Sequence, residues 1–422
     1  MTASQAPDAP RWQPPERPDW VARINEEGRC MDIAAVVPLD ARSLLDAAMR
    51  TTGLSDFGSD EWREPFGVFV QALEEEADLN LLGRIRTRSE IIQILAARLR
   101  IEETYKRHPE IEQERIAQPI IVLGQGRSGT TLLLNLLAAH PDNGAARHWE
   151  AIFPCPPPEA ATYDNDPRVA RAHLLIDQWN RVTPTLPSMG EFSAERHIEC
   201  CAIIALSFMS RTWLSTFGQV PSFEAYMAGR DMTPALLYHQ RVLKLLQWKN
   251  PRRHWVLKDV QYIDWLPILH RLYPDACFAW PHRDPVRARA SALSKIGTLQ
   301  WGRSDHPFKG TSLDCLLDPD LSAARLNAAV AFLDSGVIPD RQICHLLYAD
   351  LVADPIGAVE KLYAHFGMPL SDEGRGAMDR YMRAKPRDGR PRHMFDIGSG
   401  AALERARAAY APYVRRFGIA VE

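Results

Sequence analysis

The segment 119–140 constrains the fold of this chain more than any other. It opens with the apolar, β-branched run PIIVLG (119–124), passes through QGRSG (125–129) and continues as TTLLLNLLAAH (130–140), which has the composition of a helix. A short run that is apolar at every position is typical of a strand buried in a parallel sheet. A strand that leads through glycines into a helix leaves several backbone N–H groups aimed at one spot, where the helix dipole also favours negative charge. The segment therefore predicts an anion-binding loop in an α/β fold.

Three further strand–helix pairs follow this loop. Each begins with a short apolar run and continues into a helical pattern. The strands are expected at 254–260, 276–283 and 342–351, and their helices at about 263–272, 285–295 and 355–366. Alternation of this kind implies a parallel sheet with right-handed crossovers. The predicted fold class is α/β, a parallel sheet flanked by helices with a P-loop-like anion-binding loop.

The rest of the chain divides into a leader, a helical layer and an insertion. Residues 1–18 are proline-rich and are expected to be disordered. Residues 19–117 are predicted to be helical, because apolar residues recur there at helical spacing. Residues 118–422 are predicted to form the α/β domain, with a helical insertion at about 168–247. Because ligands of such sheets bind beside the carboxyl ends of the strands, we expect this insertion to form the acceptor pocket.

Composition excludes several classes of protein. The net charge of −3 gives no reason to expect a nucleic-acid partner, which needs clustered positive charge. No apolar run approaches the ~20 residues of a membrane span, and the start has no apolar signal core. Seven cysteines without a CxxC pair favour free thiols in a reducing compartment, so a cytoplasmic protein without a metal site is expected.

The glycine-rich loop has three interpretations. Gly124, Gly126 and Gly129 match the dinucleotide fingerprint GxGxxG. That fingerprint needs a strand ending in an acidic residue about twenty residues later, whereas the segment 143–158 is not expected to form a strand. The same loop is a Walker A frame whose lysine is replaced by threonine, which argues against a nucleoside triphosphatase. A donor with one 5′-phosphate and a sulfate would suit backbone amides, hydroxyls and one cation at Arg127. This third interpretation fits every residue of the loop, namely Gly126, Arg127, Ser128, Gly129, Thr130 and Thr131.

On these residues the chain resembles the sulfotransferases that use 3′-phosphoadenosine-5′-phosphosulfate (PAPS). Residues 126–131 are similar to the PKSGTT or PRSGTT loop of that family, with glycine in place of proline. HRDPVRARAS (282–291) supplies Arg283 and Ser291 at the spacing of the residues that bind the 3′-phosphate of the donor. LLYADLVADP (346–355) is similar to a Y-x-D-x-x-x-x-P segment whose tyrosine, here Tyr348, lies near the adenine.

HWVLKDVQYIDWL (254–266) resembles the family strand that ends in a lysine facing the transferred group, here Lys258. The whole chain looks like the bacterial branch of small sulfotransferases. It departs from the expected LKSPAH at 257–262, where this chain has LKDVQY, so the family histidine is missing. Lysine followed by aspartate resembles the tyrosylprotein group instead.

The resemblance implies transfer of a sulfuryl group from PAPS to a hydroxyl of a small-molecule acceptor, giving a sulfate ester and 3′-phosphoadenosine-5′-phosphate. Arg127 and Lys258 would balance charge on the leaving oxygen, and no metal is required. Glu150 and His148 are the candidate bases. Glu150 has the alternative of a structural ion pair with an arginine. Arg390 and Arg392 are candidates to close over the 3′-phosphate.

Two rival functions remain open on the sequence. An oxidoreductase of the Rossmann type would bind NAD(P)H and would be indifferent to PAPS. A nucleotide-binding module without activity would bind the 3′,5′-bisphosphate but transfer nothing. Two cations at the transferred group, Arg127 and Lys258, argue against the second rival.

Overall fold

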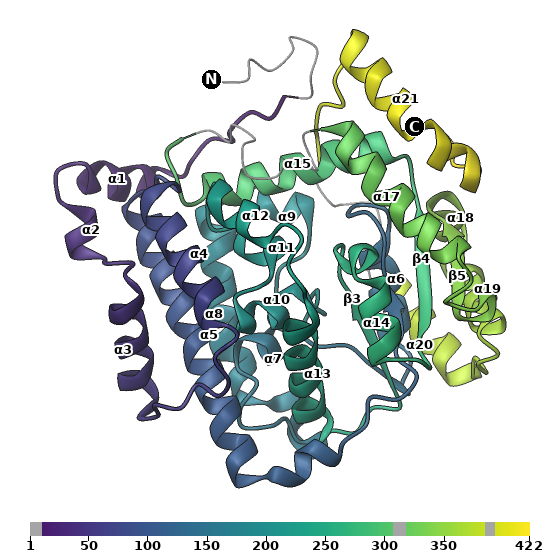
Figure 1. Ribbon diagram of the computed structural model, residues 1–422, viewed down its shortest axis with the longest axis horizontal. Helices are drawn as coiled ribbons and strands as arrows, with labels where there is room; N and C mark the ends of the chain where they lie inside the picture. Colours follow the sequence, from purple (N-terminus) through teal and green to yellow (C-terminus); the bar gives the residue numbers. More distant parts are fainter. Residues whose placement is uncertain (1–10, 307–317, 385–392) are drawn as a thin grey trace.

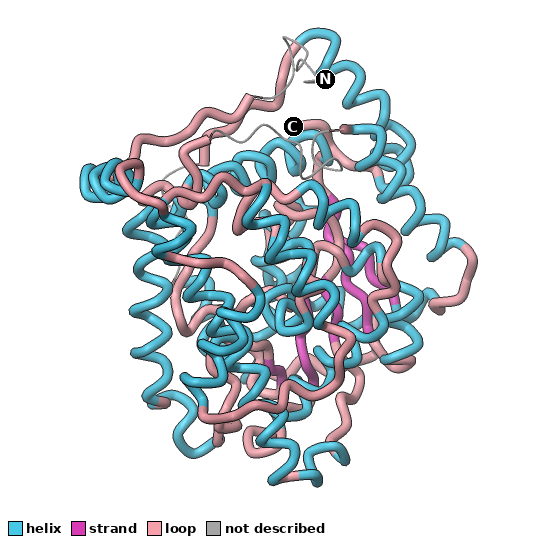
Figure 2. Tube along the Cα trace, turned by 60° about the vertical axis from the view of Figure 1, so that its left-hand side comes forward, coloured by secondary structure: helices cyan, strands magenta, loops and turns pink. Residues whose placement is uncertain are grey.

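A computed structural model of the chain describes residues 11–306, 318–384 and 393–422. Helices surround a five-stranded sheet with the strand order β2-β3-β1-β4-β5 (Figures 1 and 2). Every neighbouring pair of strands is parallel. The strands are β1 (Ile120–Val122), β2 (Asn143–Gly144), β3 (His254–Lys258), β4 (Cys277–His282) and β5 (Ile343–Leu347). The predicted α/β fold with a parallel sheet is confirmed.

The central strand β1 is apolar at every position because both faces of the sheet are covered. Ile120 and Val122 pack into a core that includes residues of α6 (Thr130–Ala138) and α19 (Pro355–His365). Ile121 points to the opposite face and joins a larger core with residues of α13 (Thr233–Gln247). Successive side chains of a strand alternate between faces, so three apolar residues serve two cores.

Two details of the predicted sheet are wrong. The segment 143–158 was expected to hold no strand, but Asn143 and Gly144 pair with the start of β3 as a short edge strand. Two residues are too few to give a readable apolar pattern. The fourth predicted strand, 342–351, ends earlier, because Tyr348 already begins α18 (Tyr348–Ala353). Helices α14 (Leu266–Leu272) and α15 (Pro285–Trp301) follow β3 and β4 near the predicted positions.

The N-terminal region and the stretch 168–247 are both helical and share one core. The first contains α1 (Asp19–Gly28), α2 (Ile33–Val36), α3 (Ala41–Thr52), α4 (Arg63–Glu75) and α5 (Leu81–Arg107). The second contains most of α8 (Pro167–Val182), then α9 (Leu186–Met189), α10 (Cys201–Ile204), α11 (Arg211–Leu214), α12 (Pro221–Met227) and α13. Phe69 of α4 packs with tilted rings against Phe223 of α12 and Phe217, with ring centroids 5.0 and 5.8 Å away. The aromatic side chains Phe208 and Phe217 are therefore core residues.

Residues 11–18 differ from the expected disordered leader. The Trp12 ring lies against Gly297 of α15, where a side chain in place of the glycine hydrogen would collide with it at 2.9 Å. Its indole nitrogen donates to the Thr298 hydroxyl at 3.1 Å. The Arg17 guanidinium lies 3.6 Å from the centroid of the Trp301 ring and forms an ion pair with Asp305. Residues 1–10 of the leader lie outside the described residues.

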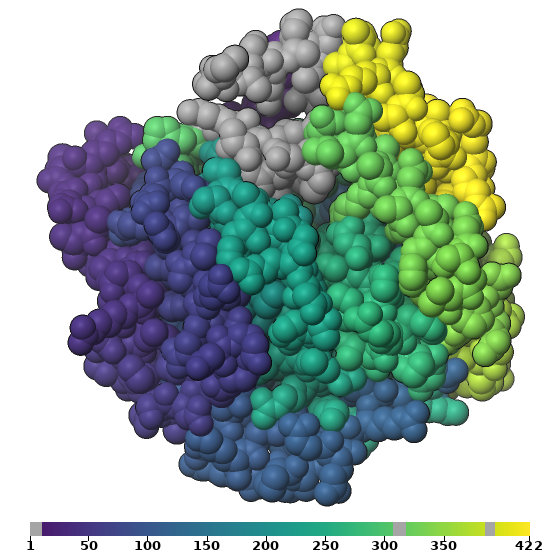
Figure 3. All heavy atoms as spheres, viewed as in Figure 1, coloured from purple at the N-terminus to yellow at the C-terminus, as the bar shows by residue number. Residues whose placement is uncertain are grey.

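The C-terminal part of the described chain contains α17 (Pro319–Asp334), α20 (Asp372–Arg383) and α21 (Gly400–Phe417). Helix α21 packs on α15 and α17, and Figure 3 shows it in yellow beside the green helices. His282 of β4 anchors it, since its Nδ1 is hydrogen-bonded to the Tyr413 hydroxyl at 2.6 Å and its ring stacks 3.9 Å from Phe417. Within the described ranges, no helix has the length and apolar character needed to span a membrane.

Candidate functional site

The glycine-rich loop lies at the carboxyl end of β1 and leads into α6. Arg127 and Gly129 have left-handed backbone angles, with φ of 70° and 96°. A side chain at Gly129 would lie 2.8 Å from the Tyr348 ring, so only glycine fits there. In the part of the chain that the structure describes, the N–H groups of residues 126–129 donate no hydrogen bond. Unpaired N–H groups before a helix form a cradle for an anion.

Arg127 joins the loop to α15. Its Nε donates to the Ser291 hydroxyl at 2.9 Å, and its Nη1 donates to the carbonyl of Met189 at 2.6 Å. Burial and the neighbouring charge of Arg283 lower the pKa of Arg127. The loop cation and one of the two residues expected at the 3′-phosphate are thus in direct contact.

Arg283 and Tyr348 complete the same group. Arg283 follows β4 and donates from Nη1 to the carbonyl oxygen of Arg127 at 3.1 Å. Its guanidinium lies 4.2 Å from the centroid of the Tyr348 ring. Four residues from three separate motifs, Arg127, Arg283, Ser291 and Tyr348, therefore meet at one edge of the sheet.

Lys258 is the last residue of β3 and lies at this same edge. Its Nζ is 2.5 Å from Oε1 of Glu199, and its side chain is only 2% exposed. Val260 lies against the loop, since a side chain at Gly126 would approach its Cγ1 to 3.4 Å. The end of β3 is therefore a neighbour of the loop.

Glu199 is a site residue that the sequence analysis missed. Burial alone would raise the pKa of this carboxyl group, but the charges of Lys258, Lys295 and Arg127 together lower it. Its side chain is 24% exposed. Asp259, the other nearby carboxylate, is 1% exposed, and burial raises its pKa to about 7. Of these two carboxylates, Glu199 is the one with access to solvent.

A local signal could have revealed Lys295 but not Glu199. Lys295 lies four residues after Ser291 on α15, so both side chains share one face of that helix. Glu199 comes from a stretch of short helices and turns, and its position depends on how the chain between residues 168 and 247 folds.

The structure does not bring Glu150 into contact with this group, and its surroundings favour the structural alternative over a base. The carboxylate is fully buried and both of its oxygens are engaged. Oε1 accepts from Arg252 at 2.7 Å, while Oε2 accepts from the Arg147 backbone N–H at 2.7 Å and the Tyr163 hydroxyl at 2.9 Å. Glu150 therefore caps α7 (His148–Ile152) and pairs with a buried arginine, which is the structural alternative.

His148 is also enclosed. It is 2% exposed, and burial lowers its pKa to about 4. Its ring packs against Trp179 and Trp213, at centroid distances of 5.6 and 6.0 Å. Because the imidazole is buried, it has little access to an acceptor hydroxyl. Its low pKa also makes it a weak base.

Two C-terminal residues reach the site. His393 is hydrogen-bonded to the hydroxyls of Ser291 and Ser294 at 3.2 and 3.0 Å. The carboxylate of Glu422 accepts two hydrogen bonds from Arg283, at 2.7 and 2.6 Å, and lies 3.1 Å from Arg287. An anionic group thus already pairs with Arg283. The basic residues Arg390 and Arg392 lie outside the described residues.

A partly exposed aromatic group borders the charged cluster. Phe192 lies with its ring centroid 5.4 Å from Nζ of Lys295 and 6.2 Å from the Trp179 ring. Trp213 packs on Trp179 at 5.6 Å. The three rings give the cluster an apolar neighbour from the predicted insertion.

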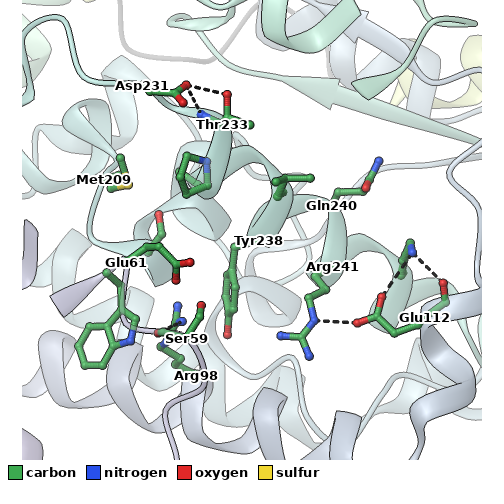
Figure 4. A pocket seen from close by; sticks show the side chains of 16 residues that line it. Ser59, Glu61, Arg98, Glu112, Met209, Asp231, Thr233, Tyr238, Gln240 and Arg241 are labelled. Carbon is green, nitrogen blue, oxygen red and sulfur yellow. Dashed lines mark hydrogen bonds and ion pairs between the residues drawn. The ribbon is translucent and has the colours of Figure 1, made fainter. Parts of the chain in front are cut away.

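A cavity of about 390 Å³ lies elsewhere, between α5, α13 and the loops beside them. Figure 4 shows Arg98 close to Tyr238, whose ring centroid is 4.2 Å from the guanidinium. Arg98 donates to the carbonyls of Phe57, Leu206 and Ser59, so its hydrogen-bonding groups serve the fold. The lining of this cavity shares no residue with the group around Arg127 and Lys258.

Comparison with known proteins gives one consistent result. The sulfotransferase family matches residues 119–372, more than half of the chain. The omega-hydroxy-beta-dihydromenaquinone-9 sulfotransferases Stf3 of Mycobacterium bovis and Mycobacterium tuberculosis are 21% identical to this chain over an alignment of 268 residues. The alignment covers 59% of this chain. The chain spans less than two thirds, 63%, of the length of these curated relatives.

Two solved structures are similar over most of their length. Sulfotransferase STF1 from Mycobacterium tuberculosis superposes with a TM-score of 0.74 at 30% identity, covering 88% of this chain and 98% of STF1. Sulfotransferase STF9 from Mycobacterium avium superposes with a TM-score of 0.77 at 25% identity, covering 91% and 98%.

Proposed function

Because this chain belongs to the sulfotransferase family, we propose that it transfers the sulfuryl group of PAPS to a hydroxyl of a small-molecule acceptor. The products are a sulfate ester and 3′-phosphoadenosine-5′-phosphate. The observation that carries the proposal is the meeting of Arg283 and Ser291 with the anion-binding loop, through direct contacts to Arg127. An oxidoreductase would need neither residue.

The residues around the loop suit a donor with phosphate groups at the 3′ and 5′ positions of its ribose. The free N–H groups of residues 126–129 and the hydroxyls of Thr130 and Thr131 would hold the 5′-phosphate and the sulfate. Arg283 and Ser291 would bind the 3′-phosphate, and Tyr348 would lie near the adenine. The cations Arg127, Arg283, Lys258 and Lys295 outnumber the carboxylates Glu199 and Glu422, which favours a polyanion.

In the transfer step, the acceptor oxygen attacks sulfur while the bond between sulfur and the bridging phosphate oxygen breaks. Lys258 stabilises the negative charge that develops on the leaving oxygen. Glu199 takes the proton of the acceptor hydroxyl. A bound anionic donor draws Lys258 away from Glu199, and the loss of this cation raises the pKa of Glu199 towards the range of a useful base.

The acceptor would be an apolar molecule with a hydroxyl group. Phe192, Trp179 and Trp213 offer it an aromatic surface next to Lys295 and Glu199. The mycobacterial relatives are named for an acceptor of this kind, an omega-hydroxylated menaquinone.

Thermal shift with defined nucleotides tests the donor. The product 3′-phosphoadenosine-5′-phosphate is expected to raise Tm, because at 100 times its Kd it adds about 2.7 kcal/mol to the free energy of unfolding. NADH and ATP–Mg²⁺ are not expected to raise Tm. Equal stabilisation by adenosine-5′-phosphosulfate, which lacks the 3′-phosphate, would remove Arg283 and Ser291 from the site. Incubation of the enzyme with ³⁵S-labelled PAPS and a metabolite extract then tests transfer, since sulfated products carry the label.

A further inference from the structure

A second cationic site lies behind the aromatic group, where α5, α8 and the end of α15 meet. A small cavity of about 20 Å³ is lined by Arg86 of α5 and by Arg303, which follows α15. Both arginines are buried, with 5% and 4% of their surface exposed. Apart from Trp179, the other lining residues are apolar or carry a hydroxyl, namely Thr183, Leu186, Thr216 and Leu299.

One carboxylate, that of Glu90, serves both arginines, and each of its oxygens already accepts one hydrogen bond. Its Oε2 accepts from Nη2 of Arg303 at 2.7 Å, and its Oε1 accepts from the Trp179 indole at 3.0 Å. Nη2 of Arg86 is 3.8 Å from Oε1, beyond the length of a hydrogen bond. Arg303 is further satisfied by the hydroxyl of Thr87 at 3.0 Å.

Arg86 is therefore a buried cation that shares its ion-pair partner, Glu90, with Arg303. Within residues 11–306, 318–384 and 393–422, its buried Nε has no hydrogen-bond partner, and its Nη2 reaches Glu90 only as a 3.8 Å ion pair. Burial and the charge of Arg303 lower the pKa of Arg86 to about 9, which still leaves it charged at neutral pH. A buried charge that shares one counter-ion with a second cation is incompletely compensated, which is costly.

We propose that the cavity between Arg86 and Arg303 binds one small monovalent anion of halide size. Two guanidinium groups against one carboxylate leave an excess of one positive charge, which an anion cancels and a water molecule does not. A volume of about 20 Å³ is close to the minimum that holds one small particle, which favours a single-atom anion over phosphate or sulfate. The site is separate from sulfuryl transfer and does not rest on the proposed function.

The bound anion would also stabilise the aromatic surface. The Glu90 carboxylate accepts a hydrogen bond from the Trp179 indole and also forms ion pairs with Arg86 and Arg303. An anion beside Arg86 relieves the demand on Glu90 and leaves its Oε1 to Trp179. The site thereby couples a buried ion to a ring that contacts Phe192.

Halide dependence of stability gives the first test. Sodium chloride is exchanged for sodium gluconate at constant ionic strength, and Tm of the full chain is measured. The wild-type protein is expected to gain about 3 °C in a saturable way when chloride reaches 100 times its Kd. Arg86→Met keeps the length of the side chain without its charge and should abolish this gain, whereas Arg50→Met, at an exposed position on α3, should retain it. Equal Tm values of the wild type in the two salts would overturn the proposal.

Diffraction from crystals grown in bromide gives a test that does not need a variant to fold. An anomalous peak between Arg86 and Arg303 is expected in the wild-type protein. A water molecule without anomalous signal at that position, or a side chain that fills the cavity, would overturn the proposal.

Discussion

Lys258 and Glu199 form an ion pair at the end of β3, with 2.5 Å between Nζ and Oε1. The two residues lie far apart in the sequence, and the chain between them includes α10 to α13. The pair holds the lysine that would assist the leaving group together with the carboxylate that would accept the proton. The two charges required at different moments of a transfer reaction thus neutralise each other before the donor binds.

The first prediction separates donor binding from the transfer step. Arg283→Ala should raise the KM for PAPS about 10- to 100-fold with a modest change in kcat, because 3′-phosphate contacts are equal in the ground and transition states. Lys258→Ala should lower kcat with little change in KM, because charge on the leaving oxygen develops only in the transition state. Steady-state kinetics with PAPS as the varied substrate measures both. A Lys258→Ala enzyme that changed only KM would contradict the catalytic role.

The second prediction concerns the base. Glu199→Gln should lower kcat by ~10²–10⁴-fold with donor affinity intact, since it keeps the shape of the side chain and removes its basicity. Glu150→Gln is the matched control: it should keep near-normal kcat and lose ~3 kcal/mol of stability, because it breaks a buried pair with Arg252. Turnover and denaturant unfolding are measured on both variants. Normal turnover of Glu199→Gln would exclude this residue as the base.

The third prediction follows from the contact between Glu422 and Arg283. The Glu422 carboxylate competes with an incoming 3′-phosphate for the same guanidinium, so Glu422→Gln should tighten binding of 3′-phosphoadenosine-5′-phosphate about 3- to 10-fold. Isothermal calorimetry at low salt measures the change. The control variant is Asp334→Asn. It removes an exposed carboxylate that pairs with Arg416 of α21, and it should leave the affinity for the nucleotide unchanged. Unaltered affinity in Glu422→Gln would mean that the carboxylate does not compete.

The fourth prediction concerns acid stability. Both ring nitrogens of the buried His239 lack a partner within the described residues, and burial lowers its pKa to about 3. Above pH 6.5 the ring is neutral in both states. As pH falls from about 6.5 towards 3, only the unfolded chain takes up the proton, so stability falls across that window. His239→Leu should raise the free energy of unfolding by about 1–3 kcal/mol at pH 7 and should weaken the acid dependence. Denaturant unfolding at pH 7 and pH 5 measures both, and an unchanged pH dependence would contradict the argument.

The parts of the site that could be predicted from the sequence are those that lie in short motifs. The loop 126–131, the pair Arg283 and Ser291, and Tyr348 each follow a strand, and parallel strands bring their carboxyl ends to one edge. Glu199 lies in no such motif, because its place is set by tertiary packing of short helices. The surroundings of Glu150 could not be predicted either, because its distance from the loop along the chain does not fix the direction of its side chain. As the third residue of α7, it turns back to the N–H of Arg147.

The sheet order has a consequence for how the chain is made. Strand β1 pairs with β3 on one side and β4 on the other, so Ile120 meets Val256 and Cys277. During synthesis at about 5–20 residues per second, the apolar β1 leaves the ribosome roughly 7 to 27 s before its first partner, β3, follows. Its backbone groups and those of the glycine loop stay unpaired for that interval. The nascent protein therefore exposes an aggregation-prone segment, and its yield should depend on chaperones that protect it until β3 and β4 arrive.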